Sequence, residues 1–250
     1  MNKRSRVAGL NLLGLGALAG LCLLGWLAIV WTAQNMAHPS VQLMMPPSAG
    51  WSSAQAFMVF AMWAVMMGAM MLPSAIPMMV IHRRVAAKRD PETRHASRWF
   101  LMAYLLTWAL FSIAATGLQW SFQRADVLSH MLRIHGQLTG GGILVAAGLF
   151  QMTPLKAMCL GKCRAPIGFL LTNWRAGRIG AFQMGLKHGQ YCIGCCWALM
   201  MLLFVGGLMS LTTIAVLSGI VAIEKLTPRG EQISRLGGGL LIAWGLWLIF

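Results

Sequence analysis

The chain has 250 residues, of which 58% are hydrophobic and only 10% are charged. Soluble domains carry about 25% charged residues, so this composition excludes an ordinary soluble protein and predicts one embedded in a lipid bilayer. The net charge of +15 comes from basic residues that cluster between apolar runs, which argues against nucleic-acid binding and is typical of a chain oriented in an anionic membrane.

Apolar windows of about 20 residues predict membrane-spanning helices. The first window follows three basic residues and is too long for the apolar core of a signal peptide, so we interpret it as a retained span. The predicted spans cover residues 7–32, 54–81, 99–120, 138–152, 185–205, 208–223 and 236–250. The last window is at the lower limit for spanning. We therefore predict an all-α, polytopic membrane helix bundle of six or seven spans, with residues 1–250 forming one domain.

The basic residues predict which loops face the cytoplasm. They are concentrated in the N-terminal arm, in the loop 82–98, in the segment 153–187 and in the loop 224–235, whereas the loop 34–53 has none. Positive loops stay inside, so we expect the bacterial inner membrane with a cytoplasmic N-terminus. The segment 153–187 is then cytoplasmic or interfacial. Its part 166–181 mixes apolar and basic residues, which suits either a short interfacial helix or an ordinary loop.

Cysteine and histidine are concentrated around the start of the fifth predicted span. On a helix, the three cysteines and the histidine of this stretch fall within an arc of roughly 100°. Two more cysteines, spaced i and i+4, lie in the preceding basic segment on the same predicted side. Thiolate and imidazole bind soft or borderline metals, and copper is favoured here over zinc. The candidate ligands are Cys192, Cys195, Cys196, His188, Cys159 and Cys163. The alternative is that these are reduced packing thiols.

Methionines form a second pattern, in the second predicted span. Met58, Met62, Met66 and Met70 follow one another at i, i+4 and would line one side of a helix. The preceding loop adds a group of further soft donors, Met36, His38, Met44 and Met45. Because thioethers select Cu(I), the pattern is a candidate metal path from outer thioethers to inner thiolates. Methionine is also a flexible core filler, and that interpretation stays open.

Glu224 is an acidic residue at the end of the sixth predicted span. It is a candidate proton or metal partner, although a snorkelling interfacial charge is the simpler interpretation. The sequence contains no phosphate loop, dinucleotide fingerprint or serine nucleophile motif. We therefore expect a binding protein without catalytic residues rather than an enzyme.

Several of these segments resemble a known bacterial family. They are Met66-Met67 with Ala69-Met70-Met71-Leu72-Pro73-Ser74, Gln151-Met152-Thr153-Pro154-Leu155-Lys156, Gly189 with Cys192-Ile193-Gly194-Cys195-Cys196-Trp197, and Glu224-Lys225. In these the chain is similar to a predicted metal-binding integral membrane protein family of unknown function. The resemblance implies a multi-span inner-membrane protein with a metal site at the cysteines.

Three functions remain in competition at this point. The first is a membrane protein that binds a soft metal, best matched by copper, for uptake, delivery or storage, with a metal-trafficking partner. The second is an accessory subunit of a larger membrane complex, because glycine-rich helices pack closely against partners. The third is a thiol oxidoreductase that uses the Cys192–Cys195 pair.

Overall fold

The computed structural model describes residues 3–47, 50–89, 96–129 and 132–250, and in these ranges the chain is all-α. Part of the predicted basic loop, residues 90–95, lies outside the described residues. The helices are α1 (Lys3–Gln34), α2 (Pro39–Gln42), α3 (Ser53–Arg89), α4 (Ala96–Arg124), α5 (Gln137–Gln151), α6 (Pro154–Arg164), α7 (Pro166–Asn173), α8 (Gly177–Gly206), α9 (Leu211–Leu226) and α10 (Gly230–Ile249). The predicted helix-bundle class is confirmed.

Five of the described helices are long and apolar enough to cross a membrane, namely the part of α1 from Gly16 to Gln34, α3, α4, α8 and α10. Helices α5 and α6 pass the same test together but are bent by 64° at their junction, and they make a sixth span if the pair crosses as one. The predicted window 208–223 corresponds to α9, which has only 16 residues. The length criterion therefore supports five or six spans in the described chain rather than seven.

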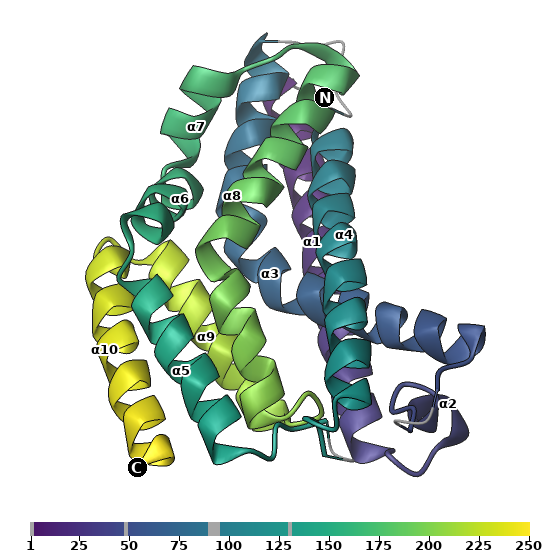
Figure 1. Ribbon diagram of the computed structural model, residues 1–250. Coiled ribbons are helices and arrows are strands. Elements are labelled where there is room, and N and C mark those ends of the chain that lie inside the picture. The colour runs from purple at the N-terminus through teal and green to yellow at the C-terminus, as the bar shows by residue number, and fades with distance from the viewer. Residues whose placement is uncertain (1–2, 48–49, 90–95, 130–131) are drawn as a thin grey trace.

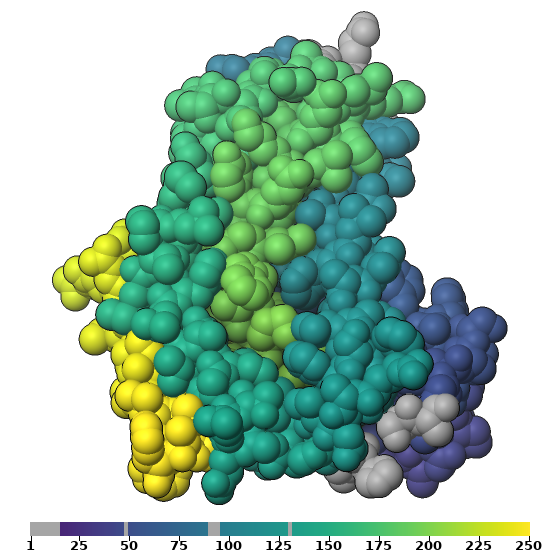
Figure 2. All heavy atoms as spheres, viewed as in Figure 1, coloured from purple at the N-terminus to yellow at the C-terminus, as the bar shows by residue number. Residues whose placement is uncertain are grey.

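Helix α8 lies in the middle of the bundle (Figure 1). It packs against α4, α5, α6 and α9, while α3 packs against α1, α4 and α9. Helix α10 packs chiefly against α5 and stands out at one edge of the molecule (Figure 2). Glycines allow this last contact, because a Cβ atom on Gly148 would lie 2.6 Å from the carbonyl oxygen of Gly238.

The junction between α5 and α6 decides where the second pair of cysteines lies. Pro154 has no backbone N–H and begins α6, and the Thr153 hydroxyl accepts a hydrogen bond from the Lys156 backbone N–H at 3.3 Å. The chain therefore ends one helix and starts another in a new direction. Helix α6 then packs along α8, which carries Cys159 and Cys163 to the side of that helix.

Helix α8 begins earlier than the sequence pattern predicts. Its first residue is Gly177 rather than a residue near 185, so Cys192, Cys195 and Cys196 lie near the middle of a 30-residue helix. A helix rises about 1.5 Å per residue, which places these residues roughly 22–29 Å from its start. The candidate ligands are therefore deep inside the bundle rather than at its end.

Candidate metal centre

Three cysteines of α8 form the base of the site. Cys192, Cys195 and Cys196 are all buried. The thiols of Cys195 and Cys196 donate to the backbone carbonyl of Cys192, at 3.2 and 2.8 Å. These local bonds point both side chains back along the helix toward Cys192, so the three sulfur atoms share one face.

A fourth cysteine reaches this face from α6. The Sγ atoms of Cys163 and Cys195 are 4.0 Å apart, although the two residues are 32 positions apart in the sequence. All six cysteines of the chain are free thiols. The structure therefore brings the two cysteine-containing stretches together, one from each of two packed helices.

A methionine of α3 completes the arrangement. The sulfur of Met71, which is fully buried, lies 3.8 Å from the Sγ atom of Cys196. With metal–sulfur bonds of about 2.3 Å, as in zinc thiolates, two sulfurs that share an ion lie roughly 3.8 to 4.6 Å apart. Both close sulfur pairs have separations in this range. We call Cys163, Cys192, Cys195, Cys196 and Met71 the sulfur cluster.

A buried cation lies against the sulfur cluster. The ammonium group of Lys225, in the last turn of α9, is 3.0 Å from the Cys192 sulfur and 3.7 Å from the Met71 sulfur. The Tyr104 hydroxyl is 3.2 Å from the same Cys192 sulfur and donates to the Met71 carbonyl at 3.3 Å. Lys225 therefore places a positive charge beside the thiol, where it can offset the charge of a metal–thiolate group.

Glu224 does not contact the sulfur cluster. Its carboxylate forms an ion pair with Lys156 at 2.7 Å and accepts a hydrogen bond from the Gln151 side-chain amide at 2.9 Å, while Lys156 also donates to the Gln151 side chain. Glu224 and Lys156 are both buried. The carboxylate thus has a buried cation as its partner, and the simpler interpretation of a snorkelling charge does not describe it.

Two other candidate ligands lie beside the cluster rather than in its close sulfur pairs. Cys159 packs against Gly194, where an added Cβ atom would be 2.8 Å from its sulfur. His188, one turn before Cys192, lies among the rings of Phe100, Tyr104 and Phe169.

Among the described residues, the common metal-ligating side chains do not form a complete ligand set. Within the described ranges, no group of three or more His, Cys, Asp or Glu side chains is arranged to hold a metal ion. In the same part of the chain, the Nδ1 atom of His188 has no hydrogen-bond partner although it is buried. An unpaired buried nitrogen is costly. A ligand bound at Nδ1 would remove this cost.

Three of the four methionines in the predicted stripe, Met62, Met66 and Met70, are buried, and Met58 is half-buried. The thioether in contact with a thiol is nevertheless Met71, which the i, i+4 pattern omits. The spacing patterns in the sequence also did not indicate Lys225 or Tyr104 as site residues. The available signal was the family resemblance, which includes Met71 and Lys225 among its motif residues.

Comparison with known proteins identifies a family to which most of the chain is similar. The model of the PpoB2 family, described as a copper chaperone, matches residues 60–248, a range that contains the whole sulfur cluster and Lys225. No curated protein and no solved structure matches the chain. Because the match covers most of the sequence, the chain belongs to the PpoB2 copper chaperone family.

Proposed function

We propose that this protein is an integral membrane protein that binds Cu(I) at the sulfur cluster and delivers it to a partner. The observation that carries the proposal is the pair of close sulfur contacts, Cys195 to Cys163 and Cys196 to Met71, buried within one bundle. They join three helices, so the cluster depends on the folded protein. The copper chaperone family supports the same metal.

The ligand set favours copper over zinc. Structural zinc sites are closed, with four nitrogen, sulfur or oxygen ligands, and the described chain offers no group of three or more His, Cys, Asp or Glu side chains for one. The neutral thioether of Met71 is a soft ligand that suits Cu(I), which accepts few ligands. Two thiolates and one Cu(I) carry a net negative charge, and the neighbouring ammonium of Lys225 balances it.

Delivery rather than permanent binding is supported by the incomplete ligand shell. A site that holds its ion with two or three soft sulfurs can pass it to an incoming thiol or thioether, since the new ligand can bind before an old one leaves. The long apolar helices and the basic segments support a place in the bacterial inner membrane with the N-terminus in the cytoplasm. A metal-trafficking protein or a larger membrane complex is the expected recipient.

The test is anaerobic Cu(I) binding by the full chain purified in detergent, in competition with a chromophoric Cu(I) chelator. We expect the variant Cys192→Ser/Cys195→Ser/Cys196→Ser to bind Cu(I) at least a hundredfold more weakly at this site. Cys22→Ser is the matched control, because Cys22 lies in α1 and its thiol donates to the Ala69 carbonyl, at 3.8 Å, rather than to a residue of the cluster. Equal copper affinity in the wild type and the triple variant would overturn the proposal.

A thiol oxidoreductase is the second candidate, because the Cys163 and Cys195 sulfurs are close enough for a short movement to join them. The two functions differ in what they require. A redox enzyme would cycle between a dithiol and a disulfide in cells, whereas a copper site needs reduced thiols. Trapping of free thiols in intact cells with an alkylating reagent distinguishes them, since a disulfide in a substantial share of molecules would favour the redox function.

A further inference from the structure

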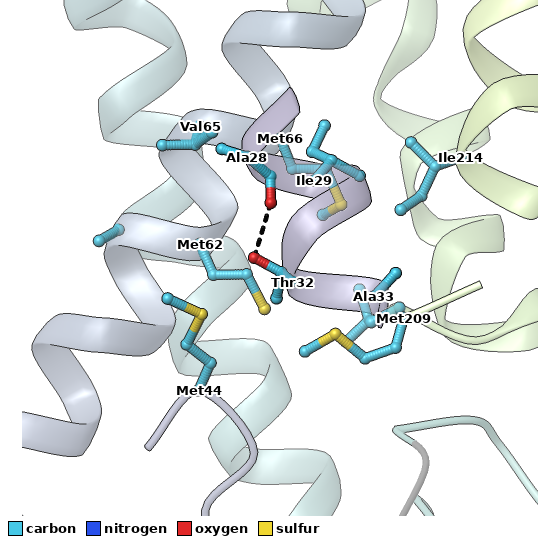
Figure 3. Close-up of a pocket in the computed structure, with 12 residues that line it drawn as sticks. Ala28, Ile29, Thr32, Ala33, Met44, Met62, Val65, Met66, Met209 and Ile214 are labelled. Carbon is cyan, nitrogen blue, oxygen red and sulfur yellow. Dashed lines mark hydrogen bonds between the residues drawn. The ribbon is translucent and has the colours of Figure 1, made fainter. Parts of the chain in front are cut away.

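A cavity of about 110 Å³ lies away from the sulfur cluster, between the end of α1, the first half of α3 and the turn that leads into α9 (Figure 3). Four methionines line it, and they come from three separate parts of the chain: Met44 from the loop after α2, Met62 and Met66 from α3, and Met209 from the turn before α9. Figure 3 shows these side chains reaching into the cavity from different sides. We call this space the methionine cavity.

The thioethers are the free donors in the methionine cavity. Its other lining residues are aliphatic except for Thr32, whose hydroxyl already donates to the Ala28 carbonyl at 2.8 Å. The lining includes no charged side chain. Hard cations need oxygen ligands, and zinc prefers thiolate, imidazole or carboxylate, so neither suits this lining. A set of neutral thioethers selects Cu(I).

The space itself distinguishes a site from simple core filling. Methionine is flexible and normally fills irregular gaps. A single water needs roughly 10–15 Å³ of cavity, so the volume here, which four methionines line, is several times larger than that. The four methionines therefore line a space that is large enough for an ion.

The methionine cavity is connected to the sulfur cluster through α3. Met66 lines the cavity and Met71 belongs to the cluster, and the two are five positions apart, which is about 7.5 Å along the helix axis. Met67 and Met70 lie between them and are both buried. Along α3, further thioethers therefore lie between the cavity and the thiols.

We propose that the methionine cavity is a second Cu(I) site, which loads the sulfur cluster. Binding in the cavity stands on its own residues, while the loading step rests on the function proposed above. Neutral thioethers leave the positive charge of Cu(I) uncompensated, whereas thiolates neutralise it, so the ion moves toward the stronger ligands. Met44 belongs to the loop 34–53, which the charge pattern predicts on the side of the membrane opposite the cytoplasm. The cavity is therefore the place where copper would enter from that side.

The test uses the full chain in detergent with Cu(I) alone as the probe, under anaerobic conditions. In the Cys192→Ser/Cys195→Ser/Cys196→Ser background we expect one residual Cu(I) site with sulfur-only ligation in X-ray absorption spectra. Adding Met62→Leu/Met209→Leu should weaken that site at least tenfold. Leucine keeps the apolar volume and removes the sulfur. Met200→Leu is the matched control, since Met200 is buried in α8 and does not line the cavity.

The outcomes separate the two proposals. If the triple cysteine variant binds no Cu(I), or binds it equally with and without Met62 and Met209, the methionine cavity is not a copper site. The proposal for the sulfur cluster then depends only on Cu(I) binding by the wild type. If the wild type binds no Cu(I), the proposed function fails as well. With the cysteines intact, Met62→Leu/Met209→Leu should slow copper loading of the cluster at least tenfold without changing its final affinity. Unchanged loading would overturn the entry role.

Discussion

The sulfur cluster and the methionine cavity are both rich in sulfur, but they differ in charge. Beside the cluster lies the ammonium of Lys225, and one residue earlier in α9 Glu224 forms a buried ion pair with Lys156. The cavity has no charged lining residue. An ion in the cavity would be held by polarisable neutral donors, whereas one in the cluster would be held by thiolates beside a buried ammonium group. The comparison suggests that ligand strength rises along α3.

The first prediction has the largest expected effect and concerns the buried ion pair between Lys156 and Glu224. Lys156→Met leaves the Glu224 carboxylate buried without its cation, which should lower the free energy of unfolding by about 3–5 kcal/mol. The double variant Lys156→Met/Glu224→Met should recover most of this loss. Denaturant unfolding in detergent, followed by circular dichroism, measures both.

The matched control for that ion pair is Arg235→Met. Arg235 pairs with Glu231 at the same 2.7 Å, but both side chains are about half exposed or more. Exposed pairs contribute only about 0–1 kcal/mol. If the Lys156→Met variant is as stable as Arg235→Met, the buried ion pair between Lys156 and Glu224 does not stabilise the folded protein.

The second prediction concerns the contact that positions α8. In Gly189→Ala the new Cβ atom would be 2.6 Å from the Thr107 hydroxyl oxygen and 2.7 Å from the Thr107 Cβ atom, which forces α4 and α8 apart. Such overpacking should destabilise the protein by about 1–3 kcal/mol. Thermal unfolding in detergent is the measurement.

Gly68→Ala provides the control for this contact. Gly68 lies in α3 beside Met67, and a Cβ atom there meets nothing within 4 Å. Alanine should instead stabilise the helix by about 0.5–1 kcal/mol. Changes of the same sign in the two variants would contradict the helix packing described here.

The third prediction tests the charge difference directly. Lys225→Gln removes the positive charge beside Cys192 and should weaken Cu(I) binding at the sulfur cluster about tenfold, while the methionine cavity keeps its affinity. Lys225→Arg should retain most of the binding, because it restores the charge. Competition titrations with a Cu(I) chelator measure each site. An equal loss at both sites would mean that Lys225 acts through folding rather than through local charge.

The fourth and smallest effect is on stability at the methionine cavity. Met62→Leu conserves apolar volume, so the free energy of unfolding should change by less than about 1.5 kcal/mol. Unfolding in detergent, compared with Met200→Leu, checks this. A much larger loss would indicate that Met62 is a packing residue rather than a ligand in an open cavity.

Some of the candidate site could be predicted from local pattern. The spacing of Cys192, Cys195 and Cys196 places them on one face of any helix, since that follows from helical geometry alone. The same reasoning selected Met62 and Met66, which line a cavity, but it favoured Met70 over Met71 for the path toward the thiols. Helix α3 has 37 residues and buries several neighbouring methionines, so spacing alone cannot identify which of them contacts a thiol.

Other features depend on how segments meet. Glu224 and Lys225 are adjacent in the sequence, yet one pairs with Lys156 on α6 and the other contacts Cys192 on α8. Successive residues of a helix point about 100° apart, so their partners belong to different neighbours. Which neighbour each one meets is decided by packing, which the sequence pattern does not show.

The sequence by itself determined that the chain forms apolar helices and that its cysteines are concentrated around one of them, because composition and helical period are local properties. Only the tertiary structure decided which sulfurs meet. The break at Pro154 turns α6 along α8 and brings Cys163 to Cys195, and the packing of α3 brings Met71 to Cys196. The methionine cavity likewise exists only where α1, α3 and the turn before α9 come together.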